Sequence, residues 1–242
     1  MVADLEAAAL VAAAVDSAAV ARLVAGKGEK MTRLTQTEKQ KISEAIREAE
    51  ASSSGELVAV IAEASDDYLY IPILWAAVIA LALPGFWVLI NHGWEIFSYK
   101  LYVIQVLTFI GLALLFRWPP LKMRLIPKNV KHRRASALAR QEFLTLGLHS
   151  THNRAAILIF VSVAEYYVEI IADQGINEKV NNGEWQQIVD DFIQQVKAEQ
   201  FAQGFLNAIQ RCKEILEQHF PPGTGGEDEL PNHLIELYSD HP

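Results

Sequence analysis

Two groups of polar residues in this sequence could do chemistry. The first comprises Asp66, Asp67 and Glu165, three carboxylates that could hold a hard divalent cation such as calcium, because calcium prefers oxygen ligands. Asp66 and Asp67 could instead be structural: they could cap the apolar segment that follows them or pair with basic residues. Both interpretations stay open.

The second group contains histidines, a cation and a carboxylate: His149, His152, Asn153, Arg154 and Asp173. His149 and His152 could ligate a metal, or they could belong to a solvated loop in which Asn153 forms a turn. Arg154 and Asp173 could form a structural ion pair or an anion clamp. A phosphatase would also need a nucleophile, a general acid and an anion cradle, and no stretch of the sequence shows that set.

Other catalytic signatures do not occur in the sequence. Cys212 is the single cysteine, which excludes an internal disulfide, and its amphipathic surroundings indicate a small core residue rather than a nucleophile. The sequence has no zinc-type spacing, no metalloprotease helix motif and no glycine-rich phosphate loop. The net charge of −8 argues against a nucleic-acid partner.

Local patterns predict the elements that position these groups. Thr35 and Glu38 have capping-box spacing and predict a helix that ends before Gly55. Residues 56–62 are a short apolar run, as in a strand buried on both faces. Residues 129–146 then predict a helix, with Asn129 as its cap and Gly147 as its stop.

The second half of the chain predicts a β-hairpin followed by two helices. Residues 155–163 and 166–172 are β-rich runs separated by two residues, which favours tight antiparallel pairing. Gly175 suggests a positive-φ turn, and Asn181 or Asn182 caps the next helix. The whole order predicts an α/β fold with a small mixed β-sheet between layers of helices.

Two uncharged apolar runs, residues 71–90 and 101–116, interrupt this domain. The first has the about 20 residues that an apolar helix needs to cross a bilayer, and the second reaches that length if residues 97–99 extend it. The runs therefore predict a two-helix transmembrane hairpin inserted after the first strand. A pair of buried core helices is the alternative, although neither run has a polar stripe.

Charge predicts the orientation of this hairpin. Eight basic residues and no carboxylate lie between Arg117 and Arg140, so the positive-inside rule places both flanking parts in the cytoplasm. A nucleic-acid patch is the weaker alternative. The residues expected to contact lipid headgroups are Arg117, Lys122, Arg124, Lys128, Lys131, Arg133 and Arg134.

The hairpin also predicts where the two polar groups lie. If the first strand runs into the hairpin, its carboxyl end faces the membrane, and the helix of residues 129–146 leads about 25 Å away from it. The strand of residues 155–163 then runs back toward the membrane. Asp66, Asp67 and Glu165 should therefore lie near the membrane, and the histidine-containing group at the distal end.

The chain divides into five parts on this basis. Residues 1–30 are an Ala-rich N-terminal extension, residues 31–67 and 119–220 form the two parts of one domain, and residues 68–118 form the hairpin. Residues 221–242 are a linker and a C-terminal apolar clip. Met31 opens the first patterned segment, so translation could start at Met1 or at Met31.

Three segments carry a resemblance to a known family: SGELVAV (54–60), THNRAAILIFV (151–161) and VEIIADQGI (168–176). They resemble the TPM domain, named for a thylakoid lumen protein, a photosystem II repair protein and a nematode receptor-accessory protein. The likeness covers roughly residues 33–66 and 127–220. It is closest to a bacterial membrane-bound branch with a hairpin after the first strand, and it implies a multi-pass protein of the bacterial inner membrane.

The resemblance implies a three-layer domain and two hypotheses about function, because some members are weak acid phosphatases and others assist membrane complexes. The chain could be a membrane-tethered cytosolic module, non-catalytic, that binds a membrane protein partner or assists a membrane complex. It could instead be a divalent-metal-dependent phosphatase that acts near the membrane surface. Lipid sensing through the basic residues is a third, weaker possibility.

Overall fold

The computed structural model describes residues 34–91, 99–151, 154–222 and 234–238. The Ala-rich extension of residues 1–30, and with it the choice between Met1 and Met31, lies outside the described residues. The chain forms two compact units. The first consists of Met1–Ser65 and His132–Pro242, and the second of Asp66–Lys131.

The first unit contains a four-stranded mixed sheet with the order β3-β2-β1-β4. β1 pairs in parallel with β2 and with β4, whereas β2 and β3 form an antiparallel hairpin. The predicted mixed sheet and tight hairpin are therefore confirmed. The C-terminal clip contributes the edge strand β4, which the sequence did not predict. The strands are β1 (Glu56–Ala62), β2 (Ala156–Ser162), β3 (Tyr167–Ala172) and β4 (Ile235–Leu237).

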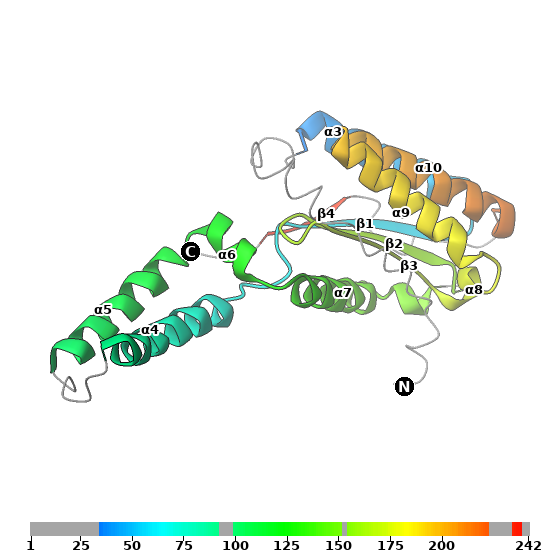
Figure 1. Cartoon of the computed structure of the whole chain (residues 1–242). Helices are drawn as coiled ribbons and strands as arrows, with labels where there is room; N and C mark the ends of the chain where they lie inside the picture. The colour runs from blue at the N-terminus through cyan, green and yellow to red at the C-terminus, as the bar shows by residue number, and fades with distance from the viewer. Residues whose placement is uncertain (1–33, 92–98, 152–153, 223–233, 239–242) are drawn as a thin grey trace. The chain divides into compact units, whose positions relative to one another are not determined.

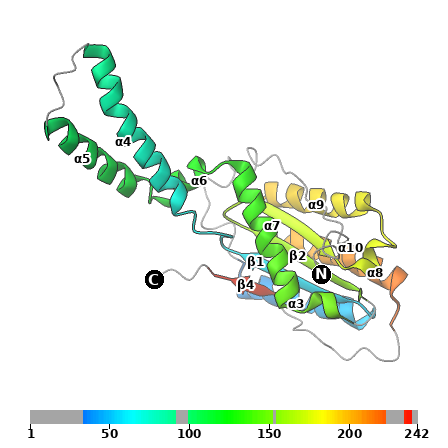
Figure 2. The ribbon, with the colours of Figure 1, turned by 90° about the horizontal axis from the view of Figure 1, so that it is seen from below.

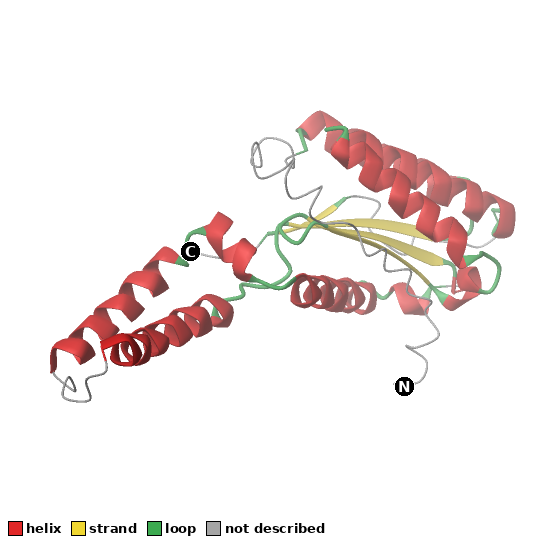
Figure 3. Cartoon of the chain, in the orientation of Figure 1, coloured by secondary structure: helices red, strands yellow, loops and turns green. Residues whose placement is uncertain are grey.

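Helices cover both faces of this sheet, which gives three layers (Figure 3). Helices α3 (Gln36–Ala51), α9 (Asn182–Lys197) and α10 (Phe201–His219) lie on one face, and α7 (Lys128–Thr145) lies on the other (Figure 1). Figure 2 shows α7 crossing the strands. Two short elements complete the unit: η2 (Leu148–Ser150) and α8 (Gln174–Asn177).

Alternation along the strands divides the core between the two faces. In β1, Leu57, Ala59 and Ile61 belong to the cluster shared with α3, α9 and α10. Val58 and Val60 belong to the cluster shared with α7. Successive side chains of a strand point to opposite faces, so a strand covered on both sides is apolar throughout, as the sequence of β1 predicted.

Two helix caps follow the predicted chemistry. The Thr35 side chain accepts from the Glu38 N–H at 3.3 Å, and the Glu38 carboxylate accepts from the Thr35 N–H at 2.8 Å. This reciprocal pair is a capping box, and it fixes the start of α3. Asn181, rather than Asn182, caps α9, because its side chain accepts from the Gly183 N–H at 2.9 Å.

Two local predictions were wrong. Asn129 does not cap α7, because the helix already includes Lys128. Gly175 does not form a positive-φ turn, because Asp173 caps α8 and the chain continues into a helical turn that contains Gly175. Among the described glycines, positive φ occurs at Gly147 (73°), which follows α7 as predicted.

The second unit contains α4 (Tyr70–Asn91), α5 (Tyr99–Leu115) and α6 (Pro119–Leu125). α4 and α5 pack against each other. Tyr68, Ile71 and Ile126 form a small buried cluster in this unit. Within the residues that the structure describes, no helix combines the length and the apolar character needed to cross a membrane.

Exposed apolar side chains distinguish the second unit from the first. Of the 21 large apolar residues that are exposed in the described structure, 19 lie between Leu69 and Trp118, and the others are Leu144 and Tyr238. Leu81, Leu89 and Leu107 are examples in which more than 60% of the surface is exposed.

Candidate functional site

A buried carboxylate lies between β3 and α7. Glu169 is fully buried, and it accepts hydrogen bonds from the Tyr167 hydroxyl at 3.0 Å and from the Ser136 hydroxyl at 3.3 Å. The ring of His132 lies 5.3 Å from the ring of Tyr167. Residues from one strand and one helix thus surround a single acid, a group that was not predicted from the sequence.

Burial dominates the electrostatics of this group. It raises the pKa of Glu169 to about 7, although the hydrogen bonds from Tyr167 and Ser136 and the charge of Arg140 act in the opposite direction. Burial, followed by the charge of Glu169, also raises the pKa of Tyr167. Glu169 therefore exchanges a proton near neutral pH. It is shielded from solvent, so the arrangement can store a proton but does not present the acid to a substrate.

One feature of the sequence could have identified this group: a glutamate within a strand that is otherwise apolar and buried. Tyr167, Glu169 and Ile171 alternate along β3 and share the face that packs against α7. A glutamate in such a position must be paired or neutral, because an isolated charge is costly away from water.

The first unit brings three members of the histidine-containing group close together. The Arg154 guanidinium donates to Gln174 Oε1 at 2.6 Å, and Asp173 accepts from the Gln174 N–H at 2.7 Å. Burial raises the pKa of Asp173, while the Gln174 N–H and the charges of Arg154 and His149 oppose that rise. His149, Arg154 and Asp173 are thus close enough to interact. His152 and Asn153 lie outside the described residues.

Glu165 has a structural environment at the opposite end of β2. It is 1% exposed, and each of its carboxylate oxygens accepts from the Ser65 N–H at 3.1 Å. The Ser162 hydroxyl also donates to it, and the Ser65 hydroxyl lies 2.8 Å from that of Ser162. Glu165 therefore ties the ends of β1 and β2 together.

Asp66 and Asp67 belong to the second unit. Asp66 accepts from the Tyr68 N–H at 3.2 Å, and the Asp67 carbonyl accepts from the Lys122 ammonium at 2.9 Å. The described residues hold no group of three or more His, Cys, Asp or Glu side chains that could bind a metal ion. A cation at Asp66, Asp67 and Glu165 stays a prediction from the sequence.

Comparison with known proteins supports the fold of the first unit. Residues 125–215, which include α7, β2, β3 and α9, match the family model TPM_phosphatase, described as the TPM domain. This stretch is similar to the TPM domain. No curated protein matches the chain.

One solved structure is similar to this TPM-like domain. It is the NMR structure of the BA42 protein from the psychrophilic bacterium Bizionia argentinensis, with 21% sequence identity and a TM-score of 0.53. The match covers 87% of this chain and 99% of BA42. At this level of identity the likeness concerns the fold.

Cys212 lies in the core of the TPM-like domain, as predicted. It is fully buried, and burial raises the pKa of its thiol to about 12. The thiolate is the nucleophilic form of cysteine, so burial disfavours a nucleophilic role for this residue.

The predicted lipid-contacting residues lie before and at the start of α7. Most of them are exposed, and Lys122 and Lys131 are half-buried. The exposed ones are Arg117, Arg124, Lys128, Arg133 and Arg134.

Proposed function

We propose that this protein is attached to a membrane through α4 and α5, and that its TPM-like domain is a non-catalytic cytoplasmic module that binds a membrane protein partner. The concentration of exposed apolar side chains on the second unit carries this proposal. Apolar surface in water is unfavourable by about 25 cal/mol per Å², and large exposed patches mark contacts with lipid or protein.

A helical pair suits hydrocarbon better than water. α4 and α5 pack against each other, so they can enter hydrocarbon as a pair. Helices satisfy most of their backbone polar groups by their own hydrogen bonds, as a lipid environment demands. The outward side chains, such as Leu81 and Leu107, then contact acyl chains.

The basic residues support a cytoplasmic TPM-like domain in this proposal. Arg117, Arg124 and Lys128 follow α5 in the chain and are exposed. Anionic headgroups of the inner leaflet attract such side chains by about 1 kcal/mol each. The inner membrane of a bacterium is the proposed location.

A binding role is favoured because two buried carboxylates of the TPM-like domain are engaged in structure. Glu165 joins two strand ends, and Glu169 is buried between β3 and α7. Neither is available to a substrate, whereas catalysis needs groups that reach the reacting atoms.

Membrane fractionation with an alkaline carbonate wash tests the attachment. We expect the wild-type chain to stay in the membrane pellet and the triple variant Leu81→Glu, Leu107→Glu, Leu114→Glu to move to the supernatant. Leu144→Glu is the matched control, because Leu144 is an exposed leucine of α7. Its retention is expected. Recovery of the wild-type chain in the supernatant would contradict the attachment.

Chemical cross-linking in intact cells, followed by capture of the full chain in detergent, tests partner binding. We expect the same membrane protein to be recovered repeatedly. Recovery of the chain alone in repeated experiments would count against a binding module while leaving the attachment intact.

Phosphoester hydrolysis is the second candidate function, favoured by the proximity of His149, Arg154 and Asp173 and by the name of the matching family model. The test uses the full chain, a generic phosphoester and divalent ions. Asp173→Asn should abolish the activity, and Asp191→Asn, at an exposed position of α9, should not. Equal activity in both variants would remove this candidate.

A further inference from the structure

The edge of the sheet is closed by a strand with few contacts. β1 pairs with β2 through seven residues, from Glu56 to Ala62, but with β4 through only three, from Val60 to Ala62. One more backbone bond joins them, from the Glu63 N–H to the Leu237 carbonyl at 3.0 Å. β4 is thus the least extensively paired strand of the described sheet.

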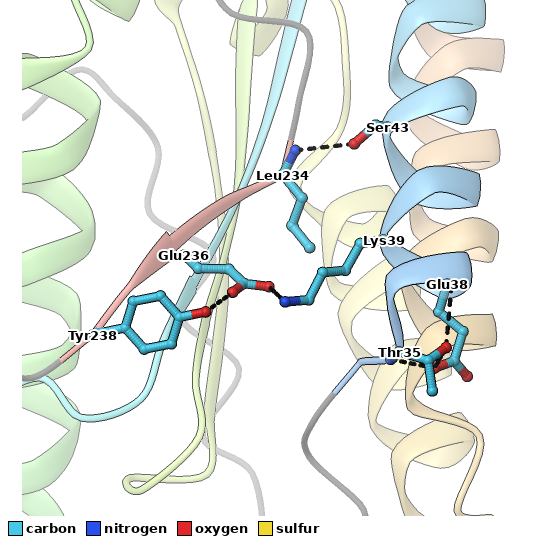
Figure 4. Close-up of polar contacts among 7 residues, drawn as sticks. All are labelled: Thr35, Glu38, Lys39, Ser43, Leu234, Glu236 and Tyr238. Carbon is cyan, nitrogen blue, oxygen red and sulfur yellow. Dashed lines mark hydrogen bonds and ion pairs between the residues drawn. The ribbon is translucent and has the colours of Figure 1, made fainter.

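The side chains of residues 234–237 contact different groups on the two faces of the sheet. Leu234 lies in the core shared with α3, α9 and α10, whereas Ile235 and Leu237 pack against the cluster shared with α7. Glu236 forms an ion pair with Lys39 of α3 at 2.6 Å (Figure 4). The edge of β1 therefore favours a segment in which the four successive residues are apolar, apolar, acidic and apolar.

The remaining contacts of β4 are peripheral. The Leu234 N–H donates to the Ser43 hydroxyl at 3.4 Å, and the Tyr238 hydroxyl donates to Glu236 (Figure 4). The side chains of Lys39 and Glu236 remain 26% and 21% exposed. Ion pairs with this exposure contribute little to stability. The β1–β2 and β2–β3 pairings do not involve β4.

The covalent connection keeps β4 in place. β4 follows α10 in the chain after a stretch that contains Gly223, Gly225 and Gly226. Because of the covalent link, β4 competes for β1 at an effective concentration that does not depend on the concentration of the protein. Another segment replaces β4 when the ratio of its concentration to its dissociation constant for β1 exceeds the corresponding ratio for the tethered β4.

The described residues of the TPM-like domain expose few large apolar side chains that a partner could contact. In the first unit, the large apolar residues exposed among the described ones are Leu144 and Tyr238, and Tyr238 follows β4 directly. Protein interfaces need a desolvated core, so the apolar surface has to be uncovered. Release of β4 would uncover the positions of Leu234, Ile235 and Leu237.

We infer that the β1 edge is a strand-addition site that β4 occupies in cis, and that a partner protein binds there by replacing β4 with an extended segment of its own. The segment carries apolar residues at the positions of Leu234, Ile235 and Leu237 and an acidic residue opposite Lys39. Backbone bonds to β1 supply affinity, and the alternating side chains supply specificity. This inference rests on the proposed binding function and names the chemistry of the partner.

A labelled peptide with the sequence of residues 231–240 is the probe. The full chain is compared with the double variant Ile235→Asp, Leu237→Asp, which weakens β4 in cis and leaves β1 and α3 unchanged. We expect the peptide to bind the variant at least tenfold more tightly than the wild-type chain. Fluorescence anisotropy in detergent measures both dissociation constants.

A charge exchange tests the register of the added strand. A peptide with lysine in place of the acidic residue should lose at least tenfold in affinity for the released chain. Lys39→Glu in that chain should restore binding. If the double variant does not fold by circular dichroism, the single variant Ile235→Asp serves as the released chain, because it changes one partly buried side chain of β4 and leaves the pairing position of Lys39 intact.

Three outcomes would overturn the inference. They are equal peptide affinity for the wild-type and released chains, no binding to a folded released chain, and no effect of the charge exchange. A concentration-dependent dimer of the wild-type chain with exchanged β4 strands would assign the site to a second copy and overturn the partner assignment. Peptide binding does not depend on lipid, so its failure leaves the membrane attachment to be judged by fractionation.

Discussion

The two units of this protein place their apolar residues oppositely. In the TPM-like unit, both faces of the sheet are covered by helices, and Phe205 and Trp185 are almost fully buried. In the α4–α5 unit, side chains of the same chemistry, such as Leu81 and Phe86, are mostly exposed. The hydrophobic effect favours removal of both sets of side chains from water. The first unit achieves this in its protein interior, and in our proposal the second achieves it in the hydrocarbon of a membrane.

The largest effect should come from a core substitution in the first unit. Phe205 is fully buried, and its ring lies 5.0 Å from that of Phe192 and 5.3 Å from that of Phe201. Phe205→Ala should lower the free energy of unfolding by about 3–5 kcal/mol, because it leaves a cavity. Phe86→Ala, in α4, should change it by less than about 0.5 kcal/mol.

Urea unfolding in detergent, followed by the fluorescence of the tryptophans, measures both changes. Equal losses for Phe205→Ala and Phe86→Ala would show that the second unit is packed as a protein core. That result would remove the contrast between the two units.

The second effect depends on pH. The pKa of Glu169 is raised by burial from 4.5 to about 7, so the folded state holds a proton that the unfolded state releases. Stability from this residue is complete below pH 4.5 and is lost as pH rises to about 7. Glu169→Gln should remove that loss, so its free energy of unfolding at pH 8 should exceed that of the wild type by up to about 3 kcal/mol.

Unfolding between pH 4 and pH 9 tests this difference. Glu44→Gln, at an exposed position of α3, is the control and should keep the wild-type profile. Parallel profiles for Glu169→Gln and wild type would mean that the buried acid does not hold its proton near neutral pH.

A third effect compares glycines in the two units. A Cβ at Gly55 would lie 2.5 Å from Leu216 Cδ2 and 2.8 Å from the Ala155 carbonyl oxygen. Gly55→Ala should therefore destabilise the first unit by about 1–3 kcal/mol. A Cβ at Gly111 of α5 meets nothing within 4 Å, so Gly111→Ala should leave the melting temperature unchanged or raise it.

The smallest effect concerns a helix cap. Thr35→Ala removes the capping box of α3 and should cost about 1 kcal/mol. Thr37→Ala, at the second residue of α3, is the matched control and should lower the free energy of unfolding by less than about 1 kcal/mol. A loss as large as that of Gly55→Ala would mean that Thr35 has a role beyond the cap.

Elements with a strong local pattern were predicted well. The bounds of β1 agree with the prediction, because an apolar run between Gly55 and the polar residues after Ala62 defines both ends. The β2–β3 hairpin follows from two β-rich runs with a short separation. The capping box of α3 depends on residues within one turn of each other.

Features that depend on distant segments were not predicted. β4 has only three paired residues, and its position depends on the edge of β1 far earlier in the chain. The environment of Glu169 depends on how α7 lies across β3, which places Ser136 within hydrogen-bond distance. Local propensity carries no information about either contact, because both are set by tertiary packing.

The most direct test of the central claim measures what surrounds α4 and α5. Cys212 is fully buried, and burial raises the pKa of its thiol, so spin labels can be directed to Leu81→Cys, Leu107→Cys and, as a control, Leu144→Cys in membranes. The account predicts that labels at 81 and 107 collide more with oxygen than with a water-soluble nickel chelate, and that the label at 144 does the reverse. Equal access of the nickel chelate to all three positions would contradict it.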